Sequence, residues 1–148
     1  MNVSRLAAAL FVLAASGASA WARIGESEAQ ISARYGSSIG DISTETFGLV
    51  RGFLMPGFIV AVKLVEGVSQ MEMISKSDKS DMSAAELAGF LKAHGADTQW
   101  NPDPFDRPNW RRWRTQDGSL VAVYDMRRHF LYIHSRKYYE EQGRRLGN

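Results

Sequence analysis

The segment of residues 57–75 constrains the fold most strongly, because it predicts a β-hairpin. Two apolar runs flank Glu66 and Gly67, and a two-residue loop with glycine second is typical of hairpin turns. With these residues as the loop, Val65 pairs with Val68, and alternation sorts the other side chains to two faces. The predicted apolar face holds Phe58, Val60, Val62, Leu64, Met71 and Met73. The predicted polar face holds Lys63, Gln70 and Glu72.

The first twenty residues have the pattern of a secretory signal peptide. Arg5 supplies a positive charge, residues 6–15 are a short apolar run, and Ala18-Ser19-Ala20 is a cleavage signal. We therefore predict a signal peptide at residues 1–20 and a single small domain at residues 21–148. Residues 21–76 and 82–148 are candidate subunits within that domain.

The same pattern predicts export, with a periplasmic or secreted protein after cleavage near Ala20. The chain contains no cysteine, so a disulfide framework and a lipid anchor on cysteine are both excluded, and the core must stabilise the domain. No segment after the signal peptide is apolar enough over a sufficient length to predict a transmembrane helix.

Two short helices are predicted by their end signals. Residues 27–36 begin with a capping box of Ser27 and Gln30 and stop at a glycine. Residues 84–94 follow a second capping box, formed by Ser83 and Glu86.

The expected fold class is α+β. The two short helices would pack on antiparallel β-meander sheet, either one sheet of about six strands or two meanders. Residues 37–46 and 97–109 are polar or proline-rich and are predicted to be loops. The order of a helix followed by three strands, twice, suggests a degenerate tandem α-βββ repeat, although ordinary helix and turn signals would produce the same order.

A second hairpin is predicted around Asp117-Gly118, followed by a further strand at residues 129–135. Its register places Arg112 opposite Val123, and a turn pairing Tyr124 with His129 would continue the sheet. One face is then apolar. The other face mixes guanidinium groups with aromatic rings, which can bind phosphate, carboxylate or stacked rings. The candidate binding residues on it are Arg112, Arg114, Phe130, Tyr132 and His134. A covering helix, with the arginine side chains reaching outward, is the alternative.

Charge is distributed unevenly along the chain. Residues 21–106 carry seven Lys or Arg against twelve Asp or Glu, whereas residues 107–148 carry ten against four. A basic C-terminal part can attract a polyanion, or it can pair with the acidic part inside one fold.

No motif for catalysis, nucleotide binding or metal binding occurs in the chain. His129 and His134 are five residues apart on a predicted strand and point to opposite faces, so they cannot readily share a metal. We expect no cofactor and no metal, and an enzyme is less expected than a binding protein.

Two short motifs carry a resemblance to a known family. Ile24-Gly25-Glu26-Ser27, followed by Arg34-Tyr35-Gly36, resembles the opening of small bacterial envelope proteins of the SmpA/OmlA (BamE-like) type. The mature chain also resembles small exported bacterial proteins of unknown function. The resemblance implies a helix leading into an antiparallel meander in an envelope protein.

These features together predict an exported, non-catalytic binding or structural module. Its partner would be a protein or an anionic envelope component, with no specific nucleic acid. Two alternatives remain open. One is a polyanion-binding protein that uses the basic, aromatic face of the C-terminal sheet, and the other is an envelope hydrolase with an unrecognised site.

Overall fold

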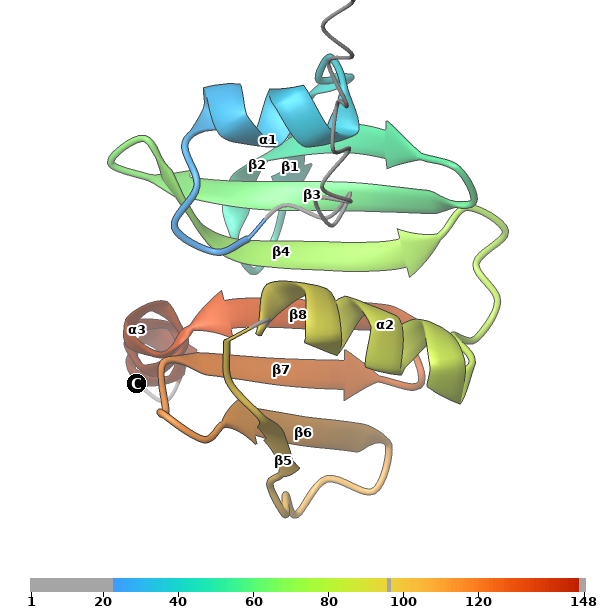
Figure 1. The fold of residues 1–148 in the computed structure, drawn as a ribbon, viewed down its shortest axis with the longest axis vertical. Helices are drawn as coiled ribbons and strands as arrows, with labels where there is room; N and C mark the ends of the chain where they lie inside the picture. Colours follow the sequence, from blue (N-terminus) through green and yellow to red (C-terminus); the bar gives the residue numbers. More distant parts are fainter. Residues whose placement is uncertain (1–22, 96, 147–148) are drawn as a thin grey trace, which may run out of the picture.

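Our computed structural model describes residues 23–95 and 97–146, and the predicted signal peptide at residues 1–20 lies outside the described residues. Within this part of the chain, eight strands form one antiparallel sheet in the order β1-β2-β3-β4-β8-β7-β6-β5 (Figure 1). The strands are β1 (Gly40–Thr44), β2 (Gly48–Met55), β3 (Phe58–Val65), β4 (Val68–Lys76), β5 (Trp100–Pro102), β6 (Trp110–Thr115), β7 (Leu120–Asp125) and β8 (Phe130–Ser135). The helices are α1 (Glu28–Tyr35), α2 (Ala84–His94) and α3 (Arg136–Leu146).

The predicted architecture of two short helices on about six strands or two meanders is wrong. Pairing of β4 with β8 joins both halves into one eight-stranded sheet, and the described residues contain a third helix, α3. Strand β1 lies in the predicted loop at residues 37–46, and β5 lies in the predicted loop at residues 97–109. Each of α1 and α2 is therefore followed by four strands, so the predicted α-βββ unit is also wrong.

The predictions for the first two helices are confirmed. Ser27 accepts a hydrogen bond from the backbone N–H of Gln30, whose side chain accepts one from the Ser27 N–H. Ser83 and Glu86 form the same reciprocal cap on α2. Each cap satisfies backbone donors that a helix N-terminus leaves without partners.

Helices α1 and α2 lie on the same side of the sheet, which we call the helix face (Figure 1). The buried core beneath them draws side chains from both halves of the chain. It includes Ile31, Phe53, Val60, Phe90, Leu131 and Ile133, each at most 1% exposed. The core is thus continuous across the β4–β8 pairing.

The central hairpin pairs Val65 with Val68, as predicted, but the register changes one step later. Leu64 lies opposite Ser69, whereas Lys63 lies opposite Met71, so Gln70 is an extra residue that forms a β-bulge. A one-residue shift moves every later side chain of that strand to the other face.

The bulge overturns a third of the predicted apolar face. Phe58, Val60, Val62 and Leu64 pack in the helix-face core as expected. Met71 and Met73 instead belong to a second cluster on the opposite face, which we call the back face. Tyr132 of β8 and Tyr138 of α3 join that cluster, so α3 covers part of the back face.

The same shift places Glu72, predicted on the polar face, in the helix-face core. Its side chain is fully buried and its Oε2 accepts a hydrogen bond from the Tyr35 hydroxyl at 3.0 Å. The His94 Nε2 lies 3.0 Å from the same oxygen. Glu72 therefore joins α1, β4 and α2 through one carboxylate.

His94 is positioned to carry a positive charge. Its Nδ1 lies 2.9 Å from the carbonyl oxygen of Phe90, so both ring nitrogens face hydrogen-bond acceptors. Only a protonated imidazole carries a hydrogen on each nitrogen and can donate to both acceptors. Burial alone would lower the pKa of His94, but the charge and hydrogen bond of Glu72 outweigh it, and the pKa is raised.

We expect Glu72→Ala to lower the free energy of unfolding by about 3–5 kcal/mol, because it leaves a buried imidazolium and a buried hydroxyl without their shared acceptor. Urea denaturation measures the change. Glu45→Ala is the control, since Glu45 is exposed in the β1–β2 turn and its loss is expected to change stability by less than about 0.5 kcal/mol. Equal stability of the Glu72 and Glu45 variants would contradict this assignment.

The raised pKa of His94 also predicts a pH dependence of stability. Its contribution is complete below the unfolded pKa of about 6.5 and is lost as the pH rises through the higher folded pKa. The urea midpoint of the wild type should therefore fall as the pH rises above about 6.5, and His94→Gln should show a flatter profile. Parallel profiles above that pH would exclude a charged His94.

Candidate functional site

The back face contains a groove with a volume of about 640 Å³. Its floor is formed by Val123, Tyr132 and His134 of β7 and β8. Four segments that are distant in sequence form its walls. They are the β1–β2 turn with Phe47, the β5–β6 loop with Phe105 and Arg107, the β7–β8 turn with Arg127 and Arg128, and α3 with Tyr139 and Gln142.

Aromatic rings make up much of the floor. The rings of Tyr132 and His134 stack with their centroids 6.1 Å apart. Phe47 packs against Tyr132 at 5.6 Å, and Tyr139 meets His134 edge-on at 5.5 Å. The floor thus offers flat apolar surface to a bound molecule.

His134 is a neutral group in this setting. The residue is 5% exposed, and burial lowers its pKa to about 3. Its Nδ1 is buried and has no hydrogen-bond partner among the described residues. A buried polar atom without a hydrogen-bond partner is rare, because it lowers the stability of the fold. Where such atoms do occur, they often belong to functional sites.

Tyr132 keeps its proton at neutral pH. Burial raises the pKa of Tyr132, and nearby Asp125 raises it further against the opposing effect of Arg128. The phenol is therefore available as a neutral hydrogen-bonding group beside the Arg128 guanidinium.

Three arginines line the rim of the groove. Arg107 stacks over Trp110, with 4.7 Å between the guanidinium carbon and the ring centroid. Asn109, with its amide oxygen turned toward Arg127, accepts two hydrogen bonds from that guanidinium at 2.8 and 3.0 Å. Among residues 23–95 and 97–146, no carboxylate forms an ion pair with Arg107, Arg127 or Arg128.

Among the described residues, one carboxylate lines the groove, and it is already hydrogen-bonded. Asp125 is 4% exposed and accepts hydrogen bonds from the backbone N–H groups of Arg127 and Arg128, at 2.9 and 3.2 Å. It holds the β7–β8 turn in place and forms no ion pair with these guanidinium groups, which outnumber it three to one. The rim is therefore positively charged, and it suits an anion.

The five residues predicted as a binding face all lie on the back face, but the structure separates their environments. Tyr132 and His134 line the groove, and half-buried Phe130 packs beside Tyr132 at 6.1 Å. Arg112 and Arg114 both pair with Asp103, at 2.7 and 2.5 Å. Burial alone would raise the pKa of Asp103, but its hydrogen bonds to these two arginines lower it.

The register behind that prediction is partly confirmed. Arg112 lies opposite Val123, as expected. The predicted pairing of Tyr124 with His129 is wrong, because Asp125 pairs with Phe130 and the turn takes up His129 with a positive φ of 59°. The error spans two residues, so the side chains within β7 and β8 keep their predicted faces.

The sequence did not single out Arg107, Arg127 or Arg128. All three lie on turns or loops, where strand alternation gives no information about direction. The Met126-Arg127-Arg128 segment between two strands was the available signal, since an exposed basic turn at the end of a buried hairpin can reach a ligand.

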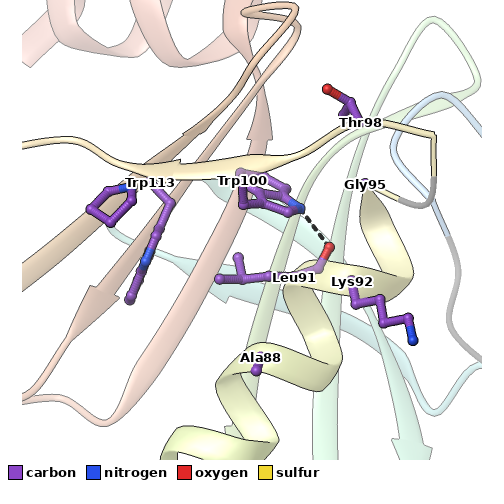
Figure 2. Close-up of a pocket in the computed structure, with 8 residues that line it drawn as sticks. Ala88, Leu91, Lys92, Gly95, Thr98, Trp100 and Trp113 are labelled. Atoms are coloured by element: carbon purple, nitrogen blue, oxygen red, sulfur yellow. Dashed lines mark hydrogen bonds between the residues drawn. The ribbon is translucent and has the colours of Figure 1, made fainter.

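A second hollow, of about 410 Å³, lies between the end of α2 and strands β5 and β6 (Figure 2). Trp100 and Trp113 form its aromatic wall, and the Trp100 indole N–H donates to the Leu91 carbonyl oxygen at 2.6 Å. Lys92 is its single ionisable lining residue, and Figure 2 shows this side chain directed away from both tryptophans. The hollow lacks the converging polar groups of the back-face groove.

Searches of protein-family models, curated proteins and solved structures found no match for this chain. Among the described residues, no three His, Asp or Glu side chains gather as metal ligands. None of the helices described by the structure has the length and apolarity to cross a membrane. The groove must therefore be interpreted from its own chemistry.

Neutral His134 predicts a loss of stability in mild acid. The unfolded chain binds a proton near the ordinary pKa of about 6.5, whereas the native pKa is about 3, so stability falls as the pH drops between these values. The slope should approach about 1.4 kcal/mol per pH unit. We expect His134→Phe, which preserves the ring packing, to reduce that slope between pH 6 and 4.5 in urea denaturation. An unchanged slope would show that His134 titrates normally.

Proposed function

We propose that this protein is a non-catalytic binding protein that holds a small organic anion in the back-face groove. The observation that carries the proposal is the set of three arginines, Arg107, Arg127 and Arg128, that line one groove and have no carboxylate partner among the described residues. An anionic group would bind at this rim, while the flat part of the ligand would rest on Tyr132 and His134.

The size and lining of the groove support a small ligand. Its volume of about 640 Å³ lies within the range of about 300–1,000 Å³ that is usual for small-molecule sites. Such sites combine apolar walls with a few polar groups that fix orientation. Here the arginines and the Tyr132 hydroxyl supply the polar groups.

The lining favours binding over hydrolysis. A catalytic nucleophile needs a base within hydrogen-bonding reach. Among the described residues that line the groove, Thr46 carries an aliphatic hydroxyl, and no carboxylate or imidazole is hydrogen-bonded to it. The ring neighbours of His134 are aromatic. The carboxylate of Asp125 is committed to its turn.

Export places this binding function outside the cytoplasm in our proposal. The support is the signal-peptide pattern of residues 1–20. The ligand would then be an organic anion of the periplasm or the surrounding medium.

The test compares two probes of matched shape, 4-phenylbutyrate and the neutral alcohol 4-phenylbutan-1-ol, by isothermal titration calorimetry. We expect the carboxylate to bind the wild type more tightly. Arg107→Gln/Arg127→Gln/Arg128→Gln should weaken its binding at least about tenfold, since charge-assisted hydrogen bonds are lost. Lys79→Gln/Lys92→Gln/Arg111→Gln removes three exposed charges elsewhere and should leave binding unchanged.

Equal loss in both triple variants would show general charge attraction in place of a site. Heparin retention tests the polyanion alternative on the same proteins. The polyanion role would be favoured over our proposal if heparin retention depended on Arg112 and Arg114 and if 4-phenylbutyrate did not reduce it.

A further inference from the structure

Beside the groove, the back face carries an uncovered apolar strip. Its residues are Ile39, Ile42, Leu54, Ile59, Met73 and Phe130. Leu54 is 55% exposed and Ile39 is 53% exposed, and Ile59, Met73 and Phe130 are half-buried. Exposed apolar patches of this kind on a sheet mark interaction surfaces more often than chance.

Strand pairing makes the strip continuous. Leu54 of β2 lies directly opposite Ile59 of β3. Ile59 in turn lies opposite Ser75, so the apolar path continues through the neighbouring row, in which Ala61 of β3 lies opposite Met73 of β4. Met73 lies directly opposite Tyr132 of β8, which is part of the groove floor. The strip therefore runs across the sheet from β2 to the groove without leaving the back face.

Gly52 closes the far end of the strip. A Cβ at this position would lie 2.9 Å from side-chain carbons of both Ile39 and Ile42. These two side chains thus lie flat over Gly52 and form an apolar end wall. The rest of the back face is occupied, because Phe47 packs over Tyr132 and His134, and Tyr138 of α3 packs against His134.

We propose that the ligand is a single-chain anionic amphiphile, whose head group binds at the arginine rim and whose hydrocarbon chain lies along the apolar strip. This inference rests on the proposed anion site and adds the class of ligand. Charge complementarity fixes the direction, since the guanidinium groups are at the groove end and the isoleucines are at the other.

The dimensions define the chain. From β8 to β2 there are three strand spacings, which gives about 14 Å. A decyl chain extends over this distance, whereas a butyl chain stays within the groove. The strip covers the chain on one side only, so each added methylene should tighten binding by about twofold, below the roughly fourfold that full burial gives.

The experiment measures dissociation constants for butyrate, hexanoate, octanoate and decanoate, each below its critical micelle concentration, by calorimetry on the purified protein. We expect stepwise tightening from butyrate to decanoate. Leu54→Thr/Ile59→Thr should remove most of the gain beyond hexanoate and leave butyrate affinity unchanged. Leu49→Thr is the matched control, because Leu49 is on the same strand, is 62% exposed and faces the helix side.

The outcomes separate the two proposals. Equal affinity for all four carboxylates, still lost in the groove arginine variant, would refute the amphiphile and retain the anion site. Binding of none of them would refute both. The strip would also be refuted if Leu49→Thr abolished the increase of affinity with chain length as fully as Leu54→Thr/Ile59→Thr does.

Two other occupants of the strip give distinct results. A second copy would appear as a dimer in analytical ultracentrifugation that Leu54→Thr/Ile59→Thr dissociates and decanoate does not. A membrane surface would appear as cosedimentation with phosphatidylglycerol vesicles in the absence of decanoate binding. Either result would overturn the proposal of a free amphiphile.

Discussion

The carboxylate of Glu72 is the interaction on which the packing of this fold depends. It is buried between two helices that come from different halves of the chain, and its Oε2 meets both the Tyr35 hydroxyl and His94. Burying a charge is unfavourable unless partners surround it, so α1, β4 and α2 must dock in one arrangement. The bulge at Gln70 turns Glu72 inward, and it also turns Met71 and Met73 toward the back face, where they support the groove.

Local signals were enough to predict the first two helices and the hairpins at Glu66-Gly67 and Asp117-Gly118. Ser27 and Ser83 specify their helix starts through caps of a few residues, and Glu66-Gly67 specifies its turn. The bulge at Gln70 was not predictable, because nothing nearby demands an extra residue. Its stabilisation comes from Tyr35 and His94, which are distant in sequence. Edge strands β1 and β5 were missed for a related reason, since β1 is polar, β5 is short and contains a proline, and only pairing with a neighbour orders them.

The floor of the candidate site could be predicted from the sequence, but its charged rim could not. Strand alternation placed Tyr132 and His134 on one face, and a two-residue register error did not alter that. Strand alternation could not show that Asp103 forms ion pairs with Arg112 and Arg114, because Asp103 belongs to a loop. Strand alternation also could not predict that Arg107, Arg127 and Arg128 line the groove. The charge that defines the site comes from loops whose positions only the tertiary structure determines.

The position of β8 bears on how the chain folds. It is the last strand along the described residues, yet it lies in the middle of the sheet between β4 and β7. Until it is available, β4 is an edge strand with unpaired backbone groups. A chain emerging from its N-terminus therefore cannot complete the sheet before residues 130–135 have been made. Folding that waits for such distant pairing is slow, and until it is complete the free edge of β4 stays open to pairing with other chains.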